Sequence, residues 1–320
     1  MKPGPSLACF KLHTRIKIDA EPRETIDWLT DIVKEEGWIC NCGSVREQAE
    51  LWDKPFQKHL RAHLSDFARL GRFSSFDFNS SAENQIQGAA FIEPTDSERL
   101  KEEKKLRRRF DVYVKTLGEM NPRDLELLCA GLLSLIKANS PQVTRYTADR
   151  GVDFFGKVHF DQHISSDDFF ASWHKQLNAW IIGQAKHYID GTVSTPALRD
   201  LAGTVTLLKG PLADRRQYPT LILRACEPVF HLLVTTGRLS NEVWKEIERS
   251  GAIGIDGEML ASYLASREIG YSNGAFDPIA FRNWLDQFSS LQNIEIGNTD
   301  GDDEPGDTSP PGGGGWPQSQ

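Results

Sequence analysis

The sequence predicts an α/β protein with a mixed sheet flanked by helices, preceded by a smaller α+β unit and followed by a disordered tail. Its 320 residues exceed the usual size of one domain, so about two domains plus tails are expected. Apolar spacing follows the order helix, strand, strand and then strand, helix, strand, helix, strand, which is typical of a mixed sheet covered by helices. The last stretch is Gly, Pro, Asp and Ser with almost nothing to bury.

Composition indicates a globular protein that does not enter a membrane. Hydrophobic residues make up 39% of the chain and aromatic residues 10%, and no apolar run approaches the roughly 20 residues that span a bilayer. The first residues lack the apolar stretch of a secretory signal. Five widely spaced cysteines are an odd number, which favours reduced thiols over a disulfide framework. We therefore expect a cytoplasmic protein.

The formal net charge of -8 is concentrated at one end of the chain. The segment from Phe288 to Gln320 holds six acidic residues and no Lys or Arg, so the rest of the chain is close to neutral. Because the electrostatics of a binding groove are local, an acidic total does not exclude DNA or RNA as a substrate.

Residues 1–95 form the predicted N-terminal α+β unit, whose role the sequence does not identify. Alternating apolar residues predict a strand over Ala8–Asp19. Helical apolar spacing predicts helices over Thr25–Glu36 and Gln48–Leu70. The charged run at 96–111 follows, and it predicts a solvated linker helix between two domains.

A second unit, at residues 112–268, carries the predicted mixed sheet. Asn121-Pro122 begins a helix that Asn139-Ser140-Pro141 ends. The later elements are strands at Val143–Tyr146, Val152–Phe160 and Trp180–Tyr188, a helix from Thr195 through Leu208, a strand at His231–Thr235, a helix at Asn241–Ser250 and a strand at Ile253–Ile255. Asp256-Gly257 is interpreted as a turn.

The end of the chain is predicted to be a helical extension and then a disordered tail. The extension occupies residues 269–296 and contains a helix from Asp277-Pro278 to Phe288. The tail occupies residues 297–320.

Three residues of the second unit fit the needs of phosphodiester hydrolysis. The reaction needs oxygen ligands that converge on a hard divalent cation, and a group that handles the attacking water. Asp153 follows Gly151 at the entry of a strand, where a tight turn lets the backbone approach a ligand. Gln184 and Lys186 lie two apart in the next strand, so both side chains leave the same face.

Each group near this centre has an expected part. Gln184 can supply an amide oxygen to the metal, and Ala185 can supply a backbone carbonyl. Lys186 would hold or deprotonate the attacking water and stabilise developing charge. Glu126, on the preceding helix, faces the site in this arrangement and can orient a hydrated metal. The Asp…Gln-x-Lys triplet alone occurs by chance in many sequences, so its flanks decide its meaning.

The flanking blocks resemble the Mrr-like branch of the PD-(D/E)xK restriction endonucleases in order and spacing. The blocks are Pro122-x-x-Leu-Glu126-Leu-Leu, Arg150-Gly-Val-Asp153, Ile181-Ile-Gly-Gln184-Ala-Lys186-His-Tyr, Pro196-Ala-Leu-Arg199-Asp-Leu-Ala-Gly203, Val234-Thr-Thr-Gly237, and Arg249-Ser-Gly251 followed by Ile255-Asp-Gly-Glu258-Met-Leu. The resemblance extends over nearly half of the chain.

This resemblance implies a three-layer core with a central mixed sheet, Mg2+- or Mn2+-dependent cleavage of DNA, and a role in restriction of or defence against foreign DNA. By position, Asp153 and Lys186 match the family's invariant chemistry. Gln184 matches the Gln variant of its usual acid, and Glu126 matches the helix carboxylate. The expected metal ligands are Asp153, Gln184, Ala185 and Glu126.

The sequence departs from the family pattern at one turn and at two extra stretches. The turn before Asp153 is Thr147-Ala-Asp-Arg-Gly151, and the extra stretches occupy 161–178 and 209–227. These stretches could change the specificity or contact a partner. Two alternatives remain. One is a nuclease for RNA or branched DNA, because the core would recognise phosphate geometry and not the sugar. The other is a catalytically weak, nuclease-like DNA-binding module in a multi-protein defence complex, as the Gln in place of an acid and the altered turn would indicate.

Other polar groups are secondary candidates. Cys40-x-Cys42 with His59-x-x-x-His63 could hold zinc, but the Cys pair is tighter than a usual zinc knuckle, which favours a structural role. A protein partner or a homodimer is expected to use the N-terminal unit or the extra stretches. Candidate phosphate contacts are Arg107, Arg108, Arg150 and Arg199.

Overall fold

A computed structural model describes residues 3–38, 44–144, 151–160, 176–189, 191–210, 218 and 220–289. The predictions for Cys40, Cys42 and Arg150, for residues 161–175, 211–217 and 219 of the two extra stretches, and for the tail fall outside these residues. Within them, no helix combines the length and the apolar character needed to cross a membrane.

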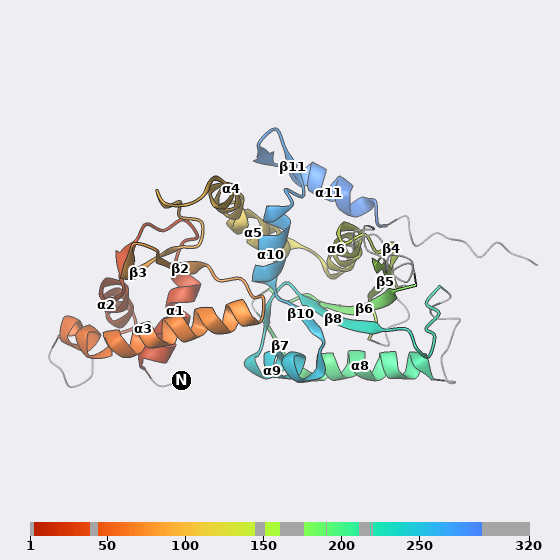
Figure 1. Ribbon diagram of the computed structural model, residues 1–320, viewed down its shortest axis with the longest axis horizontal. Coiled ribbons are helices and arrows are strands. Elements are labelled where there is room, and N and C mark those ends of the chain that lie inside the picture. The colour runs from red at the N-terminus through yellow and green to blue at the C-terminus, as the bar shows by residue number, and fades with distance from the viewer. Residues whose placement is uncertain are drawn as a thin grey trace, which may run out of the picture.

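The N-terminal unit combines three helices with a three-stranded antiparallel sheet (Figure 1). The helices are α1 (Pro5–Arg15), α2 (Thr25–Glu35) and α3 (Val45–Arg69). The sheet has the order β1-β3-β2, with β1 at Arg23–Glu24, β2 at Phe76–Asn79 and β3 at Ala82–Gly88. Buried apolar side chains from both layers form one core, which includes Leu12, Leu29, Phe56 and Ile86.

Helix α1 shows that the strand predicted over Ala8–Asp19 was wrong. The buried side chains of this helix are Ala8, Cys9, Leu12 and His13, a helical spacing and not an alternating one. Phe10, which completed the apparent alternation, is 46% exposed. The alternation therefore misled because one of its apolar residues faces solvent.

The helix predicted for the charged run at 96–111 is present, and a second helix begins at the end of the run. These are α4 (Glu98–Arg107) and α5 (Phe110–Glu119). Lys104 of α4 is buried, and its ammonium lies 2.8 Å from Asp96 Oδ2. Tyr113 of α5 is also buried, and its hydroxyl donates to Ile269 O at 2.6 Å.

The second unit is built on a five-stranded sheet in the order β10-β8-β6-β5-β4. Strands β6 (Asn178–Lys186), β8 (Val229–Thr235) and β10 (Ile253–Ile255) run parallel. Strand β5 (Phe154–His159) is antiparallel to β6 and to β4 (Asn139–Val143). This arrangement confirms the predicted central mixed sheet, although β4 begins earlier than the predicted strand at 143–146.

Helices cover both faces of this sheet, which completes the three-layer core (Figure 1). Helix α6 (Pro122–Leu135) lies on one face, where it shares a core with Phe154 and Ile181. Helices α8 (Thr195–Lys209) and α9 (Asn241–Ser250) lie on the other face, and Ile182 packs in the core beneath α8. Neighbouring residues of β6 thus alternate between the two faces.

Several C-terminal elements were not predicted. Helix α10 (Gly257–Ser266) begins where a turn was expected, because the Asp256 side chain accepts from Met259 N at 3.0 Å and caps the helix. A short parallel sheet pairs β7 with β9, and a hairpin of β11 and β12 leads to α11, the helix that was predicted from Asp277-Pro278 onward. Their bounds are Thr192–Val193 for β7, Arg238–Leu239 for β9, Tyr271–Ser272 for β11, Ala275–Phe276 for β12 and Pro278–Asp286 for α11.

Candidate active site

The sheet opens at the carboxyl end of β6. Strand β5 pairs with β6 only as far as Gly183, and Asp153 is the residue just before β5. Asp153 N donates to Gly183 O at 2.9 Å, and Asp153 Oδ2 accepts from Ala185 N at 2.7 Å. The buried carboxylate of Asp153 therefore lies along the edge of β6 that β5 leaves uncovered.

Ala185 directs both of its backbone groups toward this edge. On the opposite side of β6, Lys186 O accepts from Thr236 N at 3.3 Å. In a strand, the N–H and C=O of one residue point to the same side, and those of the next residue point to the opposite side. Because Ala185 N binds Asp153, the Ala185 carbonyl also faces the side of Asp153. A carboxylate and a carbonyl oxygen thus share the opened edge.

Gln184 and Lys186 form a contact on the face that α8 covers. With its amide oxygen facing Lys186, Gln184 donates to Ala197 O and accepts from Lys186 Nζ, both at 3.1 Å. This orientation is assigned from the hydrogen bonds, since it satisfies both ends of the amide. Gln184 is only 5% exposed, and these two hydrogen bonds hold its side chain. The Lys186 ammonium is therefore held by a neutral amide.

Glu126 belongs to α6, which covers the face of the sheet opposite α8. Cys129 lies one turn further along this helix and is fully buried. Burial raises the pKa of the Cys129 thiol well above its usual value, and the negative charges of Asp153 and Glu126 raise it further. Both carboxylates therefore act on the same buried thiol, which places them in one neighbourhood. The protonated Cys129 is not a candidate nucleophile.

Two residues that the sequence did not single out support Asp153. The Arg123 guanidinium pairs with Glu126 and donates to Thr144 O at 2.9 Å. Thr144 N in turn donates to Asp153 O at 2.8 Å. Arg123 thereby ties α6 to the backbone that carries Asp153. The sequence contained only one sign of this role, the i,i+3 spacing of Arg123 and Glu126.

The chemistry of these groups fits a hard divalent cation. Asp153 and Glu126 offer carboxylate oxygens, Ala185 a carbonyl oxygen and Gln184 an amide oxygen, all of which such cations accept. In the part of the chain that the structure describes, no three His, Cys, Asp or Glu side chains come together as a metal cluster. A cation here would therefore depend on amide and carbonyl oxygens as well as on the two carboxylates.

Glycine is required at the turn before Asp153. Gly151 has a φ of 83°, in the left-handed region that favours glycine. An added Cβ would also lie 3.2 Å from the Thr204 hydroxyl. Residues 147–150, which complete the predicted turn, lie outside the described residues.

The candidate phosphate-binding arginines lie in other surroundings. Arg199 is exposed on α8 and lines a cavity of about 150 Å3 with His231 and Glu246. Arg107 donates to Ala89 O at 3.3 Å, and Arg108 donates to Ala90 O at 3.5 Å. Arg107 and Arg108 thus both contact the segment after β3. Phosphate binding by Arg107, Arg108 and Arg199 stays a prediction.

His63 belongs to an aromatic cluster. Its ring lies 3.9 Å from that of Phe67 and 5.7 Å from that of Phe76, centroid to centroid. Burial lowers the pKa of His63 to about 4, with a smaller contribution from the charge of His13. The cysteines of the alternative zinc site lie outside the described residues, and within those residues His63 joins no metal cluster.

Comparisons with known proteins identify this second unit. Residues 117–213 match the family model Mrr_cat, described as a restriction endonuclease. The matched stretch contains Glu126, Asp153, Gln184 and Lys186. The chain therefore carries an Mrr-like restriction endonuclease domain, as its sequence blocks predicted. No curated protein matches the chain.

Two solved restriction endonucleases are similar to parts of the chain. MspJI restriction endonuclease, in complex with a 27-mer oligonucleotide, is 17% identical with a TM-score of 0.37, covering 64% of this chain and 42% of its own. The DNA modification-dependent restriction endonuclease AspBHI is 17% identical with a TM-score of 0.32, covering 66% of this chain and 47% of its own. The similarity thus spans less than half the length of either enzyme.

Proposed function

We propose that this protein is a divalent-metal-dependent endonuclease that hydrolyses phosphodiester bonds of DNA and restricts foreign DNA. The observation that supports this most is the meeting of the Asp153 carboxylate, the Ala185 backbone and the adjacent Gln184–Lys186 contact where β5 leaves β6. In this proposal residues 112–268 are the nuclease domain. Residues 1–95 recognise DNA, a modified base or a protein partner, and the protein acts in the cytoplasm.

The residues divide the work of hydrolysis among them. Asp153, Glu126, Gln184 and Ala185 would hold Mg2+ or Mn2+. A bound divalent cation offsets charge on a phosphate and lowers the pKa of its bound water. Lys186 has three N–H donors, of which the described contacts use one, at Gln184. Its other donors would hold the attacking water and stabilise charge on the phosphate oxygens.

Cleavage assays with matched variants test this function. Plasmid or phage DNA is incubated with Mg2+ or Mn2+ and with the wild type, Asp153→Asn or the control Lys54→Met, which changes an exposed lysine on α3. We expect metal-dependent cleavage by the wild type and the control, and none by Asp153→Asn. Equal cleavage by all three proteins would remove Asp153 from the mechanism. Single-stranded RNA and branched DNA in parallel reactions decide between the substrate classes.

A nuclease-like DNA-binding module is the second candidate, and two observations favour it. Gln184 stands where the family usually has an acid, and Arg123 pairs with Glu126. Both features reduce the negative charge available to a cation. Titration of the protein with Mn2+ by calorimetry separates the two functions: DNA binding without Mn2+ binding and without cleavage would favour the module.

A further inference from the structure

The N-terminal unit contacts the nuclease domain at the first turn of α10. His13, in the last turn of α1, is buried, and its Nε2 lies 2.8 Å from Glu258 Oε2. Ser75 holds His13 from its own side, because the Ser75 hydroxyl donates to His13 O at 3.0 Å and lies 3.4 Å from His13 Nδ1. The imidazole of His13 therefore bridges the two units in a fixed orientation.

Charge strengthens this bridge. Burial alone would raise the pKa of Glu258, but the hydrogen bond and charge of His13, with the charges of Arg238 and Arg72, outweigh burial and lower it. Arg72 makes a second link, since its Nη2 lies 3.6 Å from Oδ2 of Asp256, the residue that caps α10. Two residues of the N-terminal unit thus hold the start of α10.

Backbone hydrogen bonds connect Glu258 to Lys186. Gly257 N donates to Gly237 O at 2.9 Å, and Thr236 N donates to Lys186 O at 3.3 Å. The two segments touch closely, because a Cβ at Gly257 would lie 2.0 Å from Thr236 O. A shift of the first turn of α10 is therefore passed to the loop that binds the Lys186 backbone.

Thr236 also fixes the residues that follow Lys186. Its hydroxyl accepts from Tyr188 N at 3.0 Å and donates to Tyr188 O at 3.1 Å. The backbone on the carboxyl side of Lys186 thus depends on the same loop.

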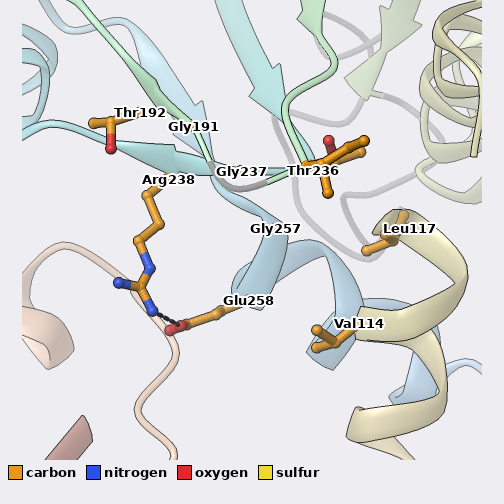
Figure 2. Close-up of a pocket in the computed structure, with 10 residues that line it drawn as sticks. Val114, Leu117, Gly191, Thr192, Thr236, Gly237, Arg238, Gly257 and Glu258 are labelled. Atoms are coloured by element: carbon orange, nitrogen blue, oxygen red, sulfur yellow. Dashed lines mark ion pairs between the residues drawn. The ribbon is translucent and has the colours of Figure 1, made fainter. Parts of the chain in front are cut away.

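The hydrogen-bonded segments that connect Glu258 to Lys186 border a cavity of about 310 Å3 (Figure 2). Thr236, Gly237, Gly257 and Glu258 line the cavity, opposite apolar side chains of α5. Figure 2 shows Arg238 reaching toward Glu258, with Nη2 and Oε1 3.6 Å apart. Because this side has open space in place of packed side chains, the first turn of α10 has room to move once His13 releases it.

We propose that His13 is a positioning residue, through which the N-terminal unit sets the position of Lys186. The proposal rests on the proposed nuclease function, because it gives Lys186 a part in catalysis. Loss of the contact lets α10 and residues 235–238 relax toward the cavity, and Lys186 moves with them. Small displacements of a catalytic group are costly, since a 1 Å misplacement can cost about 100-fold in rate. The N-terminal unit thus controls the rate of cleavage and not only the affinity for DNA.

Kinetics of full-length variants test the proposal. We expect His13→Ala to lower the cleavage rate at saturating DNA by about tenfold or more, while the Kd for DNA measured with Ca2+ stays within about twofold. His13→Gln should recover most of the rate, because its amide N–H can donate to Glu258. The control Arg69→Ala removes another ion pair between the units, with Glu248 of α9, and should keep the wild-type rate. A wild-type rate for His13→Ala, or an equal loss in Arg69→Ala, overturns the proposal.

Hydrogen exchange measures the same link without any cleavage. In His13→Ala, the amides of residues 183–189 and 235–239 should exchange faster than in the wild type, and in Arg69→Ala they should not. Circular dichroism confirms that each variant is folded. Absence of DNA cleavage by the wild type would count against the nuclease function, whereas faster exchange in His13→Ala would still support the structural link. Unchanged exchange in His13→Ala overturns the link whatever the activity.

Discussion

The two ends of β6 carry similar charged groups in opposite arrangements. At its first end, Glu227 is 9% exposed and accepts from Lys157 Nζ and from Trp180 Nε1, the latter at 3.1 Å. At its last end, Asp153 accepts from a backbone N–H, and Lys186 lies against a neutral amide. A buried carboxylate therefore pairs with a lysine at the first end of β6, whereas the lysine at the last end contacts the Gln184 amide and the carboxylate there accepts from a backbone N–H.

This difference separates a structural site from a candidate chemical one. Burial alone would raise the pKa of Glu227, but hydrogen bonds from Lys157, from Arg224 N and from Trp180 lower it below its usual value. A carboxylate whose charge is satisfied by such partners mainly stabilises the fold. At the other end, the Asp153 carboxylate accepts from Ala185 N, and the oxygens of Asp153, Ala185 and their neighbours gather at the edge of β6, where a hard cation could bind them.

The strongest test of the comparison is to remove the lysine at the last end of β6. Lys186→Met keeps the length of the side chain and removes its charge and donors. We expect the rate of DNA cleavage to fall by about 100- to 10,000-fold, the usual contribution of a group that handles the proton of the nucleophile. Thermal unfolding should change little, because Lys186 is partly exposed and bonds to a neutral amide. Full activity of Lys186→Met would contradict its assignment.

The matched change at the first end should have the opposite outcome. Lys157→Met leaves Glu227 buried without its cation, so we expect the free energy of unfolding to fall by about 2 kcal/mol. This figure is less than for a fully buried pair, because the Lys157 side chain is 21% exposed. Urea denaturation measures the loss, and cleavage per folded molecule should stay at the wild-type level. A Lys157→Met protein that is as stable as the wild type but does not cleave DNA would contradict the distinction between the two ends of β6.

A smaller effect is expected when the missing acid is restored. Gln184→Glu adds a carboxylate next to the ligands already present, which should tighten Mn2+ binding about tenfold, equal to about 1.4 kcal/mol. The new carboxylate will also pair with Lys186, and this limits the increase in affinity for Mn2+. Calorimetric titration measures the Kd, with Gln57→Glu on α3 as the control. Equal Kd values for Gln184→Glu and wild type would show that residue 184 does not contact the metal.

The smallest expected effect concerns acid stability in the N-terminal unit. The folded protein lowers the pKa of His63 to about 4, so protonation favours the unfolded chain. The contribution of neutral His63 is complete above the unfolded pKa of about 6.5 and is lost as the pH falls toward 4. Between pH 7 and pH 5, His63→Phe should lose about 1 kcal/mol less stability than wild type, a figure reduced for partial exposure. His59→Phe, at an exposed position on the same helix, should behave like wild type.

Local patterns in the sequence were sufficient for most of the central sheet and for the shared face of two candidate site residues. The apolar run around Ile181 and Ile182 predicted β6, and the two-residue spacing of Gln184 and Lys186 placed them on one face. Helices α1 and α10 were missed for local reasons: exposed Phe10 imitated a strand alternation, and Asp256 was interpreted as a turn residue although it caps a helix.

Contacts between distant segments could not be predicted from the sequence. The hydrogen bond from Arg123 to Thr144 and the contact of His13 with Glu258 join residues that no periodicity relates. Such contacts depend on how whole elements pack, and a single sequence carries no signal for that packing. The sequence therefore proposed the chemical groups of the candidate site but not the residues that hold them.

The contact between His13 and Glu258 also bears on biosynthesis. Its two partners are 245 residues apart, so the contact forms only after nearly all of the described chain has left the ribosome. Asp153 and Lys186 are synthesised long before Glu258. If His13 positions Lys186 as proposed, a nascent chain that already holds every ligand of the site still lacks its final geometry. The order of synthesis would then delay the final geometry of the site until the segment that carries Glu258 has been made.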